Sequence, residues 1–119
     1  MPNYVDGYVL PVSKKNLVTY RKVARQAGKV WKEHGALGYV ESVAEDVKPG
    51  KLTSFPQSVK LKAGETVVFS WIMFKSRKHR DQVNAKVMKD PRIDAMAAQM
   101  ASFDMKRMIY GGFNVMMQF

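Results

Sequence analysis

The sequence predicts an α+β domain in which helices cover one face of an antiparallel sheet. Residues 67–74 are apolar except for Ser70, as in a strand buried on both faces, and Ser76 can cap a helix that starts directly after them. Residues 14–34 have the periodicity of an amphipathic helix. Shorter stretches of strand-like composition lie around these segments, so strands and helices are expected to form two packed layers.

The helix predicted for residues 14–34 has one basic side and one apolar side. Wound at about 100° per residue, its basic residues fall within an arc of roughly 120°. They are Lys14, Lys15, Arg21, Lys22, Arg25, Lys29 and Lys32. The opposite arc holds apolar residues from Leu17 to Trp31, and Gly35 is a natural terminator. This helix is expected to lie on the sheet with its basic side in water.

The remaining segments are expected to supply the other strands and a long loop. Residues 4–10 alternate weakly and are expected to stop at Pro11, and residues 38–45 follow the first helix closely. Turn-forming residues punctuate residues 47–64, which predicts a long loop or an irregular hairpin. Residues 107–119 are expected to close the chain as the last strand.

A stop signal divides the second helical region. Asp90 and Pro91 can end the helix that follows Ser76 and begin a third, whose apolar residues recur at helical spacing as far as Met100. The element order is then β-α-β-β-α-(α)-β, the split β-α-β pattern of a ferredoxin-like sandwich. Residues 1–119 are expected to form this single domain, because a chain of this length suits one core.

The strand at residues 67–74 also predicts a partner subunit. Phe69 and Trp71 are expected on one side of it, and Val68 and Ile72 on the other. Helices of the same chain can cover only one of these sides. A homodimer that packs sheet on sheet is the simplest cover for the other side.

Composition excludes several classes of protein and site. The chain has no cysteine, which rules out disulfides, thiolate catalysis and cysteine-based metal sites. No apolar run approaches the roughly 20 residues that cross a bilayer, and residues 1–11 lack the order of a signal peptide, so a cytosolic protein is expected. His34 and His79 have no third ligand fixed near them, so no metal and no other cofactor is expected.

Six stretches along nearly the whole chain match one family. They are YVDGYVLPV (residues 4–12), KVWKEHGALGYVE (29–41), DVKPGKLTSFP (46–56), ETVVFSWI (65–72), NAKVMKDPR (84–92) and FDMKRMIYGGF (103–113). In these the chain resembles the YbaA-like proteins, a family of unknown function in the dimeric α+β barrel superfamily. The resemblance implies a ferredoxin-like fold, dimerisation through the sheet and a pocket between helices and sheet in each subunit. It assigns no catalytic residue.

His34 is the first candidate for acid/base chemistry. It ends the first helix next to Trp31, shortly before Tyr39 and Glu41 on the following strand. A histidine beside a carboxylate is a typical acid/base pair, because it titrates near neutrality and the carboxylate fixes its tautomer. The alternative is a structural histidine that stabilises the end of the helix.

Asp6 and Arg107 are the second candidates. Asp6 interrupts the first strand, where an unpaired buried charge would be costly, and Arg107 could be its partner. If both point into a cavity between helices and sheet, they could orient an anionic or hydroxylated ligand. The alternative is a structural ion pair at the rim of the sheet.

A pocket for a small organic molecule is expected among polar and aromatic residues of the strands and the first helix. Its predicted lining is Trp31, Tyr39, Ser70, Trp71 and Tyr110. Methionines crowd the last quarter of the chain and either line such a pocket or pack the core and the dimer.

A non-enzymatic protein that binds nucleic acid or another polyanion is the alternative function. The formal net charge of +10 and the basic helix favour it, and the split β-α-β order occurs in RNA-recognition domains. The aromatic stretch YGGFNVMMQF, however, lies on the last strand, whereas those domains stack bases on central strands. Nucleic acid is therefore the weaker prediction.

Overall fold

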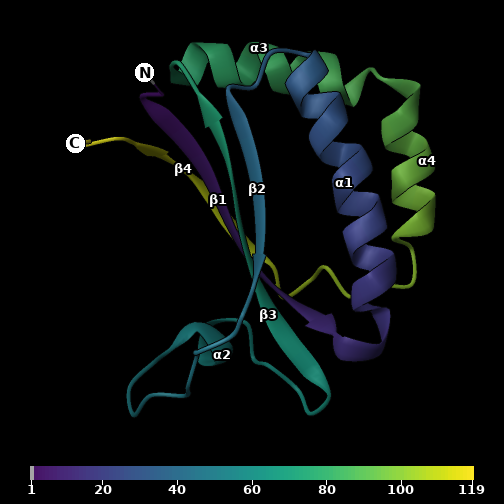
Figure 1. The fold of residues 1–119 in the computed structure, drawn as a ribbon, viewed down its shortest axis with the longest axis vertical. Helices are drawn as coiled ribbons and strands as arrows, with labels where there is room; N and C mark the ends of the chain where they lie inside the picture. The colour runs from purple at the N-terminus through teal and green to yellow at the C-terminus, as the bar shows by residue number, and fades with distance from the viewer. Residues whose placement is uncertain (1) are drawn as a thin grey trace.

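The computed structural model describes residues 2–119. The chain runs β1 (Tyr4–Ser13), a single turn of 3-10 helix η1 (Lys14–Asn16), α1 (Leu17–Glu33), β2 (Gly38–Val43), α2 (Phe55–Ser58), β3 (Glu65–Phe74), α3 (Arg77–Met88), α4 (Pro91–Gln99) and β4 (Ile109–Asn114). The four strands form one antiparallel sheet in the order β2-β3-β1-β4. Helices α1, α3 and α4 lie on one side of it (Figure 1). The predicted α+β class and ferredoxin-like split β-α-β arrangement are confirmed.

The strand register brings four polar side chains into one row across the sheet. β1 and β3 pair over ten residues, with Tyr8 opposite Ser70. Ser70 in turn lies opposite Glu41 of β2, and Tyr8 lies opposite Tyr110 of β4. Side chains directly opposite each other share one face of a sheet, and here it is the face toward the helices. The polar row crosses all four strands.

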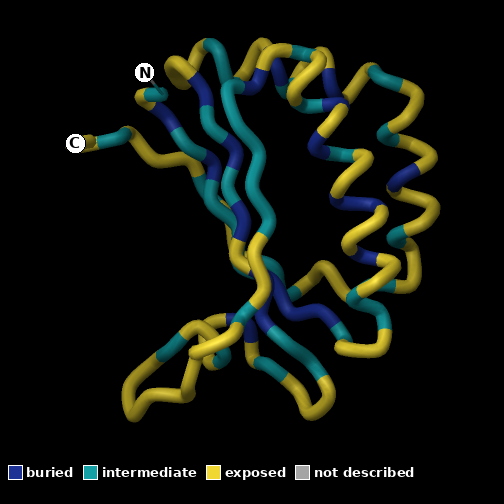
Figure 2. Tube along the Cα trace, in the orientation of Figure 1, coloured by how far each residue is buried: buried dark blue, intermediate teal, exposed yellow. Residues whose placement is uncertain are grey.

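Apolar residues surround this row and form the core between sheet and helices. α1 buries Tyr20, Val23, Ala24 and Val30 against the sheet, while its basic residues stay exposed (Figure 2). Phe74, at the end of β3, is fully buried. The predicted amphipathic helix is therefore confirmed, with its first turn wound as the separate turn η1.

Two predicted helix starts are confirmed by their caps. Ser76 accepts a hydrogen bond from the backbone N–H of His79 at 3.1 Å, and Asp90 accepts one from Arg92 at 3.0 Å. These oxygens satisfy N–H groups that a helix leaves unpaired at its first turn. The segment between residues 47 and 64 is largely a loop, as predicted, and also holds α2.

Strand ends differ from the prediction. β1 does not stop at Pro11 but continues to Ser13. Pro11 is tolerated within the strand because β4 pairs with β1 only as far as Val9. Beyond Val9, β1 has one neighbouring strand instead of two, which suits a residue that lacks an N–H donor. The strand predicted for residues 107–119 is shorter, and covers Ile109–Asn114.

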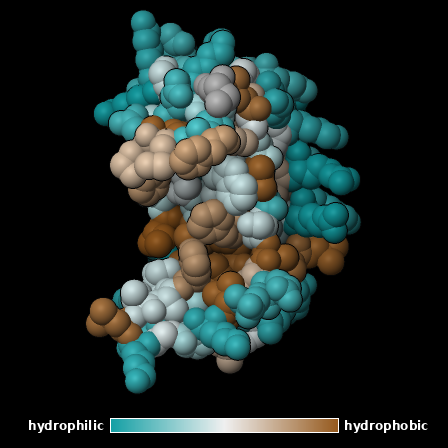
Figure 3. Space-filling view, turned by 60° about the vertical axis from the view of Figure 1, so that its left-hand side comes forward, coloured by the Kyte–Doolittle hydropathy of each residue, from teal (hydrophilic) through white to brown (hydrophobic). Residues whose placement is uncertain are grey.

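Within residues 2–119, the other face of the sheet carries only the short helix α2, whose Phe55 ring lies 5.8 Å from the ring of Phe69 on β3. Side chains that alternate with the buried ones point to this side, and several large apolar residues remain exposed. Phe69 is 40% exposed, Ile109 46% and Phe113 59%. Apolar side chains gather in the middle of this side (Figure 3). We call this surface, which also includes Val40 and Trp71, the bare sheet face. None of the helices within residues 2–119 is long and apolar enough to cross a membrane.

Candidate functional site

A cavity of about 290 Å³ lies between α1, α4 and the sheet. Most of its wall is apolar. The walls come from α1 (Val23, Ala27), β3 (Ile72), α4 (Ile93, Met96) and the following turn (Met100). Part of the methionine-rich last quarter therefore lines this cavity. Its size lies close to the lower limit for pockets that bind small organic molecules.

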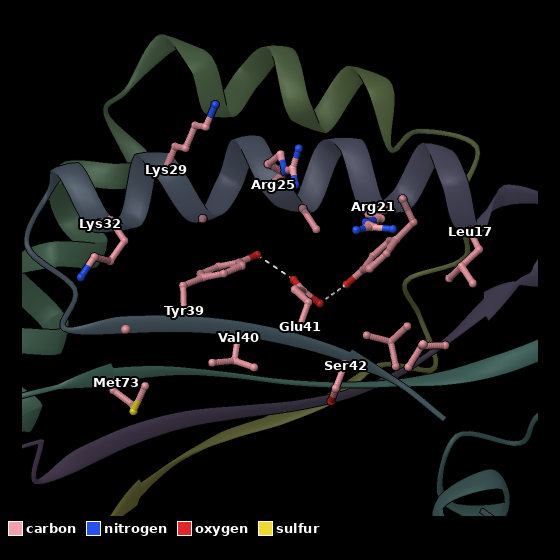
Figure 4. Close-up of a pocket in the computed structure, with 16 residues that line it drawn as sticks. Leu17, Arg21, Arg25, Lys29, Lys32, Tyr39, Val40, Glu41, Ser42 and Met73 are labelled. Atoms are coloured by element: carbon pink, nitrogen blue, oxygen red, sulfur yellow. Dashed lines mark hydrogen bonds between the residues drawn. The ribbon is translucent and has the colours of Figure 1, made fainter. Parts of the chain in front are cut away.

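Glu41 is the acidic residue in the wall, and two tyrosines hold it. The Tyr20 hydroxyl donates to Oε1 of Glu41 at 2.7 Å, and the Tyr39 hydroxyl donates to Oε2 at 2.7 Å (Figure 4). Burial, reinforced by the negative charge of Glu41, raises the pKa of both tyrosines well above the usual value of 10.0. Burial also raises the pKa of Tyr8, in the same wall, to about 12. These hydroxyls therefore keep their protons at neutral pH.

Local packing places Tyr39. Its ring lies against Gly28 of α1, where a Cβ atom would come within 2.9 Å of ring atom Cδ1. Trp31 packs beside the same ring, with centroids 6.1 Å apart, and its Nε1 donates to Asn84 of α3 at 3.0 Å. The glycine thus allows the close approach that carries the Tyr39 hydroxyl to Glu41.

A wider groove of about 880 Å³ lies on the outer side of the same carboxylate, between α1 and the edge strand β2. Tyr20, Ala24, Tyr39 and Glu41 line both the groove and the cavity, so the two spaces share a wall. Basic residues stand along α1 above β2 (Figure 4). They are Arg21, Arg25, Lys29 and Lys32.

His34 does not meet Glu41, so that predicted pair is wrong. His34 Nε2 lies 2.8 Å from Oδ2 of Asp90, the residue that caps α4. Glu41 instead reaches Tyr20, which is roughly 20 Å away from His34 along the axis of α1. Arg92 also binds Asp90 at 2.8 Å, and these contacts lower the pKa of the carboxyl well below its usual range. His34 therefore ties the end of α1 to the start of α4.

The predicted pair of Asp6 and Arg107 is also wrong. Asp6 is 4% exposed and accepts a hydrogen bond from Nη1 of Arg80, on α3, at 2.7 Å. Burial raises the pKa of Asp6, and Arg80 opposes that shift. Arg107 lies near the opposite end of β1, because the register places Ile109 beside Val9.

Arg107 has an acidic partner of its own. Both of its terminal nitrogens donate to the carboxylate oxygens of Glu65 at 2.7 Å, and Nη1 also donates to the Lys60 carbonyl at 3.0 Å. This pairing lowers the pKa of Glu65 to about 2. The bidentate pair joins the start of β3 to the segment before β4 and lies away from the cavity lining.

The residues predicted to line a pocket fall into two groups. Trp31, Tyr39 and Ser70 lie in the cavity wall. Trp71 points to the bare sheet face, because side chains alternate along β3, and its ring meets Phe69 at 5.4 Å. Tyr110 is on the helix side of the sheet but lies outside the cavity, 72% exposed and stacked on Tyr8.

Tyr20 and Gly28 are the functional positions that the sequence prediction missed. A signal for Tyr20 was present, because a tyrosine on the apolar side of an amphipathic helix requires a hydrogen-bond partner once buried. Glu41 occupies the inward-facing position two residues after Tyr39, so it was a candidate for that partner. Within residues 2–119, no group of three or more potential metal-binding side chains is close enough to hold an ion.

Residues 3–105 match a family described as "Protein of unknown function (DUF1428)". The chain belongs to this family. It is 48% identical over 110 residues to the uncharacterized protein YbaA of Escherichia coli K12, covering 92% of this chain and 93% of that one, and equally similar to YbaA of Shigella flexneri. The resemblance to YbaA-like proteins is confirmed.

Two solved structures share the fold at low sequence identity. A NIPSNAP family protein of unknown function from Agrobacterium tumefaciens matches with a TM-score of 0.58 and 14% identity, over 96% of this chain and 88% of that one. A dimeric ferredoxin-like protein from an uncultured marine organism matches with a TM-score of 0.53 and 10% identity, over the full length of both chains. These matches establish the fold and assign no reaction.

The Glu41 carboxylate is the group of this site that can bind a polar part of a ligand. Each oxygen of Glu41 accepts one tyrosine hydroxyl and has further lone pairs, so it can accept a hydrogen bond from a hydroxyl or amine of a ligand. The tyrosines fix its orientation and keep their own protons, since their pKa values are raised. The site therefore offers a rigid acceptor at the edge of an apolar space.

We expect Gly28→Ala to destabilise the protein, although alanine is the better helix former. The added methyl group would collide with the Tyr39 ring, and such overpacking costs about 1–3 kcal/mol, more than the gain in helix propensity of up to about 1 kcal/mol. Chemical denaturation measures the change in free energy of unfolding.

Tyr39→Ala provides the control, because it removes the ring that the methyl group meets. In that background Gly28→Ala should be neutral or stabilising. An equal loss of stability in both backgrounds would contradict the proposed packing of Gly28 against Tyr39.

Proposed function

We propose that this protein binds a small, largely apolar organic molecule in the cavity between α1, α4 and the sheet, and that the molecule donates a hydrogen bond to Glu41. One observation carries the proposal: a carboxylate held by the buried Tyr20 and the half-buried Tyr39 lies in the wall of a mostly apolar cavity. A few well-placed polar groups among apolar side chains are typical of ligand sites.

The position of Glu41 supports a functional role over a purely structural one. A partly buried carboxylate is costly, and the folded chain could satisfy Tyr20 and Tyr39 with neutral acceptors. The carboxyl group instead lines both the cavity and the groove. Should a bound molecule carry an acidic proton, Glu41 is the group placed to accept it, within reach of the cavity.

Filling the cavity tests this proposal with a neutral probe, octanediol, which carries a hydroxyl at each end of an apolar chain. Ala27 lies in the cavity wall but not in the groove, so Ala27→Leu should weaken octanediol binding about tenfold or more by occupying part of the 290 Å³ space. Isothermal titration calorimetry measures the affinity.

Ala98→Leu is the matched control, since Ala98 is exposed on α4 and absent from the cavity wall. Its affinity for octanediol should equal that of the unmodified protein. The proposed function is refuted if Ala27→Leu binds octanediol as tightly as Ala98→Leu, with both variants folded by circular dichroism.

We further propose that a second copy of the chain covers the bare sheet face. Exposed Phe69, Ile109 and Phe113 support this assembly, because apolar residues clustered on a monomer surface are typical of an interface. One of the solved structures with this fold is described as a dimeric ferredoxin-like protein. Packing sheet on sheet would remove these side chains from water.

A charge placed on the bare sheet face should therefore dissociate the dimer. We expect the unmodified chain to sediment with twice the mass of 13.5 kDa at micromolar concentration, and Phe113→Lys to sediment as a monomer. Leu52→Lys introduces the same charge at a residue that is 94% exposed in the loop and should leave the dimer intact. A monomeric unmodified chain would contradict the proposal.

A further inference from the structure

The groove between α1 and β2 combines a basic rim with an apolar floor. Arg21, Arg25 and Lys29 follow each other at intervals of four residues, so their side chains emerge on one stripe of the helix. Below them the groove is lined by small and apolar residues that include Ala24, Gly28 and Val43. A surface of this kind offers contact to two chemically different parts of one molecule.

The cations on the rim have no acidic partner among residues 2–119. Every ion pair formed by the lysines and arginines of this part of the chain involves Arg77, Arg80, Arg92 or Arg107. The one acidic residue that lines the groove is Glu41, and both of its oxygens already accept tyrosine hydroxyls. The rim therefore keeps its positive charge available for an external anion.

We propose that the ligand of this site is an amphipathic organic anion, whose carboxylate or phosphate group binds Arg21 and Arg25 at the rim and whose apolar part lies along the groove toward the cavity. The inference rests on the proposed function, because it assigns a charge to the molecule that the cavity accepts. Guanidinium groups suit this role, since they bind carboxylate and phosphate oxygens through paired N–H donors.

Glu41 sets the direction in which such a molecule binds. Its negative charge, in the wall shared by groove and cavity, repels an anionic group and accepts a hydrogen bond from a neutral one. The charged end is then held outside at α1, and the uncharged end lies beside Glu41 and Tyr39. The arrangement also disfavours a simple inorganic anion, because that would leave the apolar floor uncovered.

Two probes of equal length test the assignment. Hydroxyoctanoate carries a hydroxyl and a carboxylate at opposite ends, whereas octanediol replaces the carboxylate by a second hydroxyl. Calorimetry at constant ionic strength should show hydroxyoctanoate binding about tenfold more tightly than octanediol, as expected for a charge-assisted contact. The double variant Arg21→Gln/Arg25→Gln should lose that advantage and bind the two probes with similar affinity.

Lys15→Gln/Lys22→Gln is the matched control, because it removes the same charge from exposed residues of η1 and α1 that do not line the groove. It should preserve the preference for hydroxyoctanoate. A loss of this preference in the control would show that net charge, and not the groove, attracts the anion, and would overturn the inference.

The remaining outcomes separate the inference from the proposed function. If both probes bind equally and Ala27→Leu weakens both, the groove takes no anion but the cavity still binds its ligand. If Ala27→Leu weakens neither probe, the proposed function fails as well. Inorganic phosphate or a short oligonucleotide that displaces hydroxyoctanoate at equal concentration would also overturn the inference, because it would identify the rim as a general polyanion surface.

Discussion

The ten-residue register between β1 and β3 determines which side chains face the helices. It sets Tyr8 opposite Ser70, and the flanking strands extend this row to Glu41 and Tyr110. A shift of one residue would turn the inward set of side chains toward the opposite face of the sheet. Core, cavity and carboxylate therefore share one determinant, the pairing of two central strands whose inward residues are largely apolar.

α1 completes the site because its two sides have different roles. The buried side brings Tyr20 and Gly28 to the sheet, where one supplies a hydroxyl to Glu41 and the other makes room for Tyr39. The exposed side carries the basic stripe above the groove. A single amphipathic helix thus contributes to the wall of the cavity and to the rim of the groove, and Glu41 lies where the two spaces meet.

Local signals predicted most elements of this fold, whereas contacts between distant segments lay beyond them. Helix caps and amphipathic helices depend on residues close together in sequence. The caps at Ser76 and Asp90 and the amphipathic pattern of α1 could therefore be predicted. Pro11 was misjudged because its tolerance depends on where β4 ends. The pairs of Asp6 with Arg80 and Arg107 with Glu65 join residues far apart in sequence, and only the tertiary packing of α3 and of the segment before β4 brings them together.

The cavity and the groove both depend on how Tyr20 and Tyr39 hold Glu41, and the ionisation of these two tyrosines reports on that arrangement. In a ¹³C NMR titration of the ring Cζ atoms, Tyr20 and Tyr39 should stay protonated above the usual tyrosine pKa of about 10, because burial and the charge of Glu41 raise the pKa of both. Glu41→Gln should lower the pKa of both residues, because it removes the neighbouring negative charge. Ionisation of either tyrosine near pH 10, or no response to Glu41→Gln, would show that Glu41 is not held by these two hydroxyls.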